Sequence, residues 1–164
     1  MGEVIDLARI QQIMSNGNYD EARPLLKDYL TANPNDALAL RLYGNTYAYT
    51  GFLGKAKKIW RDALKKFPEN ADLIYNYALA HYLQGNLYYA RVYWKKALKL
   101  TPEDSEVYFN LGQIARDEGR LYAAIKLWRQ ALKFKPENVE VMNNIGVAYA
   151  TLHSFGKAAI WYRK

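Results

Sequence analysis

A repeat of 34 residues runs along nearly the whole chain and decides what it can fold into. Prolines, glycines and alanines each recur at this interval without a gap. A unit of this length cannot bury its apolar face alone, so neighbouring units stack and share a core. The columns that keep the interval are Pro34, Pro68, Pro102 and Pro136, then Gly17, Gly51, Gly85 and Gly119, and then Ala22, Ala56, Ala90, Ala124 and Ala158.

Each repeat has the pattern of two helices. Within residues 105–138, apolar side chains recur at helical spacing over 107–115 and again over 121–132. Gly119 separates these blocks and can adopt the left-handed conformation that closes a helix. Pro136 ends the second block, because proline lacks an amide donor and restricts the residue before it. We therefore predict a helix, a turn and a second helix in every repeat.

Other columns predict how the helices begin and how closely they pack. An acidic or amide pair follows each proline and is expected to cap the next helix. Small residues let two helices approach closely, and large residues fill the space between them. The pairs are Asn35-Asp36, Glu69-Asn70, Glu103-Asp104 and Glu137-Asn138; the small residues are Gly44, Ala78, Gly112 and Gly146; the large ones are Trp60, Trp94, Trp128 and Tyr162.

This pattern resembles the tetratricopeptide repeat (TPR) family, whose signature runs through Leu-Gly, Tyr, Ala, Phe and Ala to Pro. The fourth repeat reads VYFNLGQIARDEGRLYAAIKLWRQALKFKP from Val107 to Pro136. The resemblance implies an all-α fold, an α-solenoid of about five helix-turn-helix repeats. It also implies a right-handed superhelix whose first helices line a concave groove. We expect a single array over 1–164, with repeats at 3–36, 37–70, 71–104, 105–138 and 139–164, the last incomplete.

The terminal repeats depart from the family pattern. Asp6, Ile10 and Ile13 stand where the family has aromatic, glycine and tyrosine residues, which is typical of a capping repeat. His153 replaces the turn glycine and is expected to reach the left-handed region at some cost. The apolar residues 160–161 have no following repeat in this sequence. We expect that the natural chain continues or that this end packs against another surface.

The side chains offer little for catalysis. With no Cys, the chain has no disulfide, thiolate metal ligand or cysteine nucleophile. We interpret His81 as a half-buried side chain with satisfied hydrogen bonds and His153 as a turn residue. Ser15, Ser105 and Ser154 lie near predicted helix ends and are interpreted as turn and cap residues. We expect no enzymatic activity, no metal and no cofactor.

No signal peptide or membrane-spanning run is visible in the sequence. We therefore expect a cytoplasmic location, or the soluble face of a larger assembly.

The groove implied by the resemblance combines amides with apolar and aromatic side chains. Asn76, Asn110 and Asn144 occupy one position in three successive repeats. Their amides either hold a peptide backbone or simply support the helix surface. We expect the apolar residues to be exposed as an interface. The candidate groove residues are Arg41, Asn45, Tyr49, Tyr75, Asn76, Leu79, Tyr82, Phe109, Asn110, Gln113 and Asn144.

A carboxylate clamp, found in the chaperone-tail-binding members of the family, is matched only in part. Arg41, Asn45 and Asn76 fit three of its five positions. The two remaining positions should be basic, but they hold Glu106 and Asn110, and the glutamate would repel a ligand carboxylate. We therefore do not expect the specificity of the clamp. First helices and turns carry a net negative charge, so a neutral or basic peptide should fit the groove better than an acidic one.

Charge is divided between the two helices of each repeat. The chain has 23 Lys and Arg against 16 Asp and Glu, a net charge of +7. Most bases fall in second helices, which would form the outer layer, and most acids fall in first helices and turns. The basic columns form either a solvated face or a contact for an acidic protein or anionic lipid. Nucleic acid fits less well, because few aromatic residues interleave there. This basic ribbon comprises Arg61, Lys65, Lys95, Lys99, Arg129 and Lys133.

Three functions remain open at this point. The first is a non-enzymatic scaffold for protein–protein interaction, with an extended or helical partner peptide in the concave groove. The second is self-assembly into a homo-oligomer through terminal repeats or faces of opposite charge. The third is binding of an acidic partner, anionic lipid or nucleic acid on the convex face. A fold of this kind does not choose among them.

Overall fold

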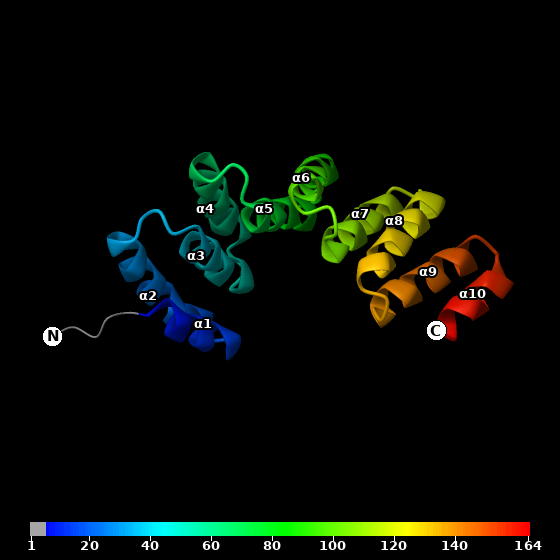
Figure 1. Cartoon of the computed structure of the whole chain (residues 1–164), viewed down its shortest axis with the longest axis horizontal. Coiled ribbons are helices and arrows are strands. Elements are labelled where there is room, and N and C mark those ends of the chain that lie inside the picture. Colours follow the sequence, from blue (N-terminus) through cyan, green and yellow to red (C-terminus); the bar gives the residue numbers. More distant parts are fainter. Residues whose placement is uncertain (1–5) are drawn as a thin grey trace. The chain divides into compact units, whose positions relative to one another are not determined.

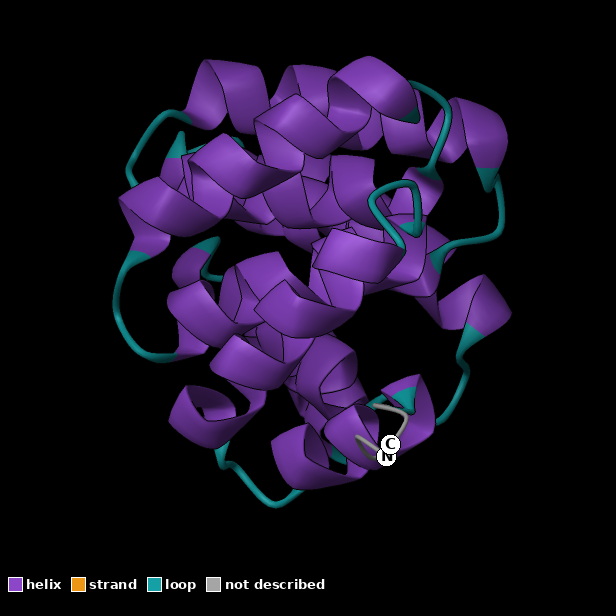
Figure 2. Cartoon of the chain, turned by 90° about the vertical axis from the view of Figure 1, so that its left-hand side faces the viewer, coloured by secondary structure: helices purple, strands orange, loops and turns teal. Residues whose placement is uncertain are grey.

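The computed structural model describes residues 6–164, which form ten α-helices joined by short turns (Figure 1). Figure 2 shows only helices and loops in this described part. The expected start of the first repeat at residue 3 lies outside the described residues. The all-α class and the five helix-turn-helix pairs are confirmed. The pairs are α1 Leu7–Ser15 with α2 Tyr19–Ala32, α3 Ala37–Tyr49 with α4 Leu53–Lys66, α5 Ala71–Leu83 with α6 Leu87–Leu100, α7 Ser105–Asp117 with α8 Leu121–Phe134, and α9 Val139–Thr151 with α10 Phe155–Tyr162.

The chain divides into two compact units, which are described separately. The N-terminal unit ends at Tyr93 and the C-terminal unit begins at Trp94, so the boundary falls inside α6. Core clusters in each unit extend from one helix pair to the next. In the first unit, Leu26 belongs to a cluster shared by α1, α2 and α3, and Leu73 to one shared by α4 and α5. In the second unit, the cluster around Trp128 is shared by α7, α8 and α9. The superhelical path implied by the resemblance stays a prediction.

The turns and caps follow the repeated columns. The four turn glycines have positive φ, between +74° at Gly119 and +86° at Gly51. His153 takes the same conformation, with φ 55°, as expected for the residue that replaces the fifth glycine. First helices begin with side-chain caps: Asn70 Oδ1 accepts from the backbone N–H of Leu73 at 2.9 Å. A cap of this kind contributes about 1 kcal/mol to helix stability. The same role is taken by Asp6, Asp36, Asp104 and Asn138.

The close approach within a helix pair is made by an indole lying against a glycine. A Cβ added at Gly112 would lie 2.3 Å from Nε1 of Trp128, so only glycine leaves room for the ring. The buried indole N–H then donates to the carbonyl oxygen of Phe109 at 3.1 Å. Trp60 repeats this arrangement in the N-terminal unit, where it lies against Gly44. In these two pairs, the small and large columns therefore act as expected.

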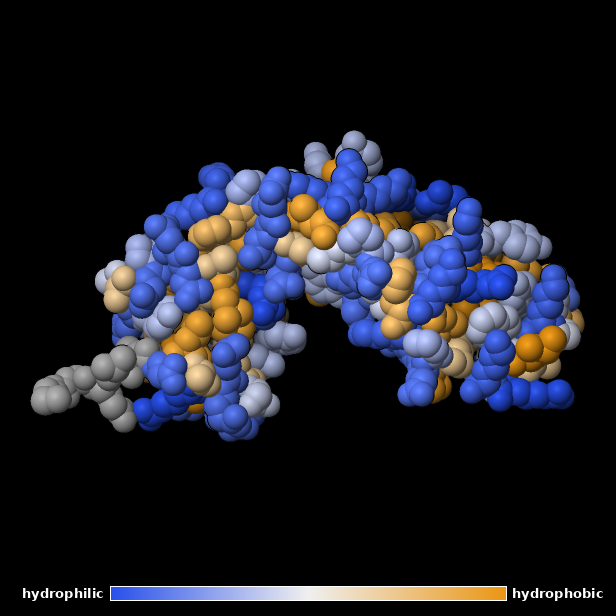
Figure 3. Space-filling model, in the orientation of Figure 1, coloured by the Kyte–Doolittle hydropathy of each residue, from blue (hydrophilic) through white to orange (hydrophobic). Residues whose placement is uncertain are grey.

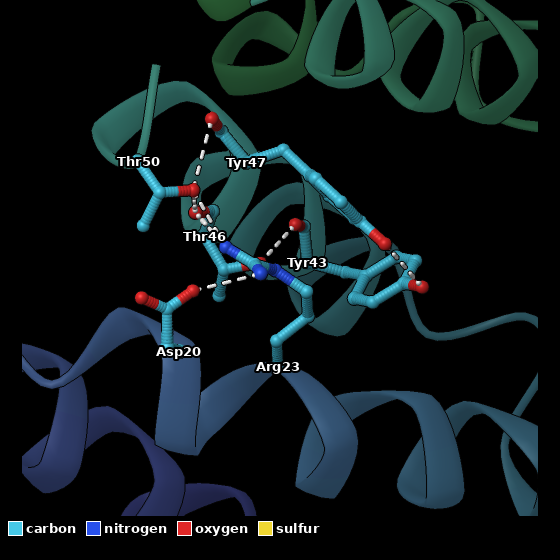
Figure 4. A network of polar contacts seen from close by, with 6 residues as sticks. All are labelled: Asp20, Arg23, Tyr43, Thr46, Tyr47 and Thr50. Carbon is cyan, nitrogen blue, oxygen red and sulfur yellow. Dashed lines mark hydrogen bonds and ion pairs between the residues drawn. The ribbon is translucent and has the colours of Figure 1, made fainter. Parts of the chain in front are cut away.

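A polar network joins α2 to α3 in the N-terminal unit (Figure 4). The Arg23 guanidinium donates to the Thr46 carbonyl at 2.9 Å and to Thr50 Oγ1 at 2.6 Å. It also lies 4.5 Å from the centroid of the Tyr47 ring and pairs with Asp20 at 2.8 Å. The network fixes α3 against the preceding repeat. No expectation from the sequence included it.

The last helix, α10, exposes only part of its apolar surface. Ile160 is exposed, in line with the expectation from the sequence. Trp161 is instead half-buried and packs against the core of the C-terminal unit. In the described residues, no helix is both long enough and apolar enough to span a membrane.

Candidate functional site

The first helices α3 and α5 lie side by side in the N-terminal unit and bring together Arg41, Asn45 and Asn76. The Asn76 amide donates to Asn45 Oδ1 at 2.8 Å. Each side-chain amide carries both donor and acceptor groups, so this pair retains one unused NH2 and one unused carbonyl among the described residues. Arg41 pairs with Asp72 across the same helices at 3.6 Å. These residues form a half-buried polar strip, and its amide pair keeps one NH2 and one carbonyl available for further hydrogen bonds.

Exposed apolar side chains lie at the carboxyl ends of these helices. Tyr49 is 67% exposed at the end of α3, and its ring stacks on Tyr19 with centroids 4.6 Å apart. Leu83 is 61% exposed at the end of α5. In the space-filling view, apolar surface shows in patches between hydrophilic side chains (Figure 3). Stacking holds the Tyr49 ring in place, so this aromatic surface is positioned before any partner arrives.

Several apolar side chains of the candidate groove are less exposed than expected from the sequence. Tyr75, Leu79 and Tyr82 are half-buried, and Phe109 packs partly against the core of the C-terminal unit. The positions that face the groove in the family also contribute to packing here, since each repeat buries apolar surface against its neighbours. Less apolar area is therefore available than the sequence suggested.

The three asparagines do not form a uniform series. Asn76 is bonded to a neighbouring amide, whereas Asn110 is only 8% exposed. The Asn144 amide donates to the carbonyl oxygen of Glu140, one turn earlier in its own helix, at 3.0 Å. Gln113 is half-buried, and its Oε1 atom is buried with no hydrogen-bond partner among the described residues. The bond of Asn76 therefore joins two adjacent first helices, whereas that of Asn144 stays within its own helix.

His81 is buried among tyrosine rings, and its side chain lacks the hydrogen bonds expected from the sequence. Its ring lies 4.7 Å from that of Tyr77 and 5.2 Å from that of Tyr89, centroid to centroid. Neither ring nitrogen has a hydrogen-bond partner among the described residues. Burial lowers the pKa of His81, and the nearby charge of Lys57 lowers it further. The interpretation as a packing residue stays, but the hydrogen bonds assumed for it are absent from the described part.

The serines serve the helix ends in different ways. Ser15 Oγ donates to the Gln12 carbonyl at 2.8 Å, at the end of α1. Ser105 is buried, and its hydroxyl donates to the Ala131 carbonyl at 3.0 Å, which ties α7 to α8 rather than capping α7. Ser154 precedes α10 without a side-chain capping bond. No group of three His, Cys, Asp or Glu that could hold a metal ion occurs in residues 6–164.

The basic ribbon is not uniform either. On α4, Asp62 bonds Lys65 at 2.8 Å and lies 3.6 Å from Arg61. The hydrogen bond from Lys65 holds the pKa of Asp62 below its usual value. On α8, the residues in register with these two bases are Arg129 and Lys133, and they form no ion pair with any described residue. The sequence carried this signal, because an acid, Asp62, stands between the two bases of the second repeat, whereas Gln130 stands at that position in the fourth.

Paired helices stacked in chain order, with a glycine–indole contact inside two of the pairs, define an α-helical repeat protein. Models described as "TPR repeat" and "Tetratricopeptide repeat" match residues 13–51, 44–88, 93–126 and 112–152. The chain belongs to the tetratricopeptide repeat family. No curated protein matches it in sequence.

Several solved structures share this fold at low sequence identity. MamA is 22% identical, with a TM-score of 0.82 over 96% of this chain and 91% of its own. PilF from Pseudomonas aeruginosa is 22% identical, with a TM-score of 0.87 over 95% of this chain and 72% of its own. YrrB, described as a TPR protein with an unusual peptide-binding site, is 24% identical, with a TM-score of 0.71 over 93% of this chain and 78% of its own.

Proposed function

We propose that this chain is a non-enzymatic scaffold that binds an extended or helical segment of a partner protein in the groove implied by its family. The Asn45–Asn76 amide pair is the observation that carries the proposal. Its unused NH2 and carbonyl are complementary to the C=O and N–H of a peptide backbone. Backbone contacts of this kind bind a segment without specifying its side chains.

Apolar and charged neighbours of the pair favour particular partner segments. Exposed Tyr49 and Leu83 offer contacts for apolar side chains. The Asp72 carboxylate is 71% exposed, and the Arg41 charge beside it is engaged by that ion pair. A neutral or basic segment is therefore expected to bind better than an acidic one. The peptide-binding site described for YrrB, which shares the fold, supports a binding role for this class of surface.

A peptide library displayed on phage, selected against the whole chain, tests the proposal. Selected peptides are resynthesised and titrated by fluorescence anisotropy against the N45A/N76A double variant. Loss of two hydrogen bonds of about 1 kcal/mol each weakens binding by roughly tenfold or more. Asn16→Ala is the matched control, because it removes an exposed amide in the turn after α1. Peptides that bind the double variant as tightly as the parent would refute the site.

A further inference from the structure

A cavity of about 540 Å³ opens between α8 and α9 of the C-terminal unit. This size lies within the usual range of small-molecule sites, about 300–1,000 Å³. Its wall combines bases, tyrosines and one amide, and contains no acidic side chain. The residues that line it are Tyr122, Ile125, Lys126, Arg129, Gln130, Lys133 and Tyr149.

No residue within 6–164 neutralises the positive charge in this cavity. Lys126, Arg129 and Lys133 form no ion pair within the described residues. The Lys157 ammonium lies 5.6 Å from the centroid of the Tyr149 ring, so a fourth positive charge adjoins the wall. Concave surfaces lined by one sign of charge concentrate the opposite ion. The cavity therefore favours an anion.

The second repeat provides an internal comparison. There, Asp62 lies between Arg61 and Lys65 and engages both. In the fourth repeat, the same register position holds Gln130, which carries no charge and leaves its two basic neighbours unpaired. An amide also contributes an N–H donor, which a carboxylate cannot. The bases of the second repeat are thus neutralised by an acid of their own helix, whereas those of the fourth repeat are not.

A second comparison concerns the ring at the wall. In the first two repeats, Arg23 lies over Tyr47, with its guanidinium carbon 4.5 Å from the ring centroid. One repeat interval taken three times leads from these residues to Ile125 and Tyr149. Ile125 is buried in the core and has no charged group to place over the ring. The position filled internally by a guanidinium in one unit is thus part of an open cavity in the other.

We propose that this cavity binds a compact phosphate-bearing anion with at least two negative charges. The Arg129 guanidinium can hold two phosphate oxygens at once, and Lys126 and Lys133 add charge. The hydroxyls of Tyr122 and Tyr149 can donate further hydrogen bonds. A diphosphate in solution and a lipid phosphate headgroup share this chemistry. The cavity belongs to the C-terminal unit, whereas the Asn45–Asn76 amide pair belongs to the N-terminal unit.

Titration calorimetry of the whole chain with inorganic pyrophosphate at low salt is the first arm of the test. Sedimentation with phosphatidylcholine vesicles, with and without phosphatidic acid, is the second. Gln130→Asp recreates the acid found on α4 and is expected to weaken binding by at least tenfold. Arg129→Gln is expected to do the same. Gln11→Asp, at an exposed position of α1, makes the same chemical and net-charge change far along the sequence and is expected to leave binding intact.

The outcomes divide clearly. Saturable pyrophosphate binding that Gln130→Asp abolishes supports the site with a soluble ligand. Binding only to phosphatidic acid vesicles, lost in the same variant, supports it with a lipid source. Equal weakening by Gln11→Asp and Gln130→Asp would show an effect of net charge alone and overturn the proposal. No binding in either arm would overturn it as well.

Discussion

Replacing Gly112 by alanine tests the close contact between α7 and α8 most directly. The new Cβ would lie 2.3 Å from Nε1 and 2.4 Å from Cδ1 of Trp128. The indole is fully buried, so it cannot swing into solvent without opening the pair. It must shift, and the hydrogen bond from its N–H to the Phe109 carbonyl lengthens or breaks.

The expected loss follows from three contributions. Overpacking a filled core costs about 1–3 kcal/mol. A buried indole N–H without its acceptor costs about 1–3 kcal/mol more. Alanine recovers about 1 kcal/mol because it is the better helix former. We expect the free energy of unfolding to fall by about 3 kcal/mol.

Urea unfolding followed by far-UV circular dichroism measures this loss. Gly54→Ala is the matched control, because Gly54 is also helical and nothing lies within 4 Å of its added Cβ. That variant is expected to gain up to about 1 kcal/mol. If Gly112→Ala were as stable as Gly54→Ala, the glycine would not be required by the indole, and the reasoning would fail.

Two further changes probe the N-terminal unit. Arg23→Met removes the bonds to Thr46 and Thr50 and is expected to cost about 2 kcal/mol in urea unfolding, whereas Lys27→Met, exposed on the same helix, should change little. The lowered pKa of His81 means that the unfolded chain binds its proton more readily, so the free energy of unfolding should fall as the pH drops below about 6.5. His81→Phe should remove that part of the pH dependence and His153→Asn should not; an unchanged slope in His81→Phe would contradict this account.

Local features were predictable from the sequence because each depends on residues close together in the repeat. Proline, glycine and capping columns act within one turn, so Gly119 and Asn70 behave as their neighbours dictate. The contact of Trp128 with Gly112 was also readable, since it recurs in register in another repeat. Such columns report on hairpin geometry, which is common to all repeats.

Exposure at the candidate site could not be read in the same way. Asn76, Asn110 and Asn144 share one column, but their surroundings come from residues on other helices that differ between repeats. Arg23 reaches partners on the following repeat, and no local pattern signals that choice. The contrast between Asp62 and Gln130 was visible in the sequence. Whether the neighbouring bases form ion pairs depends on side-chain geometry, which the sequence does not give; the bases beside Asp62 are paired and those beside Gln130 are not.

The hydrogen-bond acceptors of the Trp60 and Trp128 indoles have a consequence for which side chains can vary in this protein. Trp60 bonds the main-chain oxygen of Arg41, and Trp128 bonds that of Phe109. Both acceptors belong to residues at candidate recognition positions, but the bond uses the backbone that every amino acid carries. The side chain at such a position can therefore be replaced without removing the hydrogen bond from the indole N–H. Under the proposed function, the preference for one partner over another can therefore change during evolution while the packing of the helix pair stays the same.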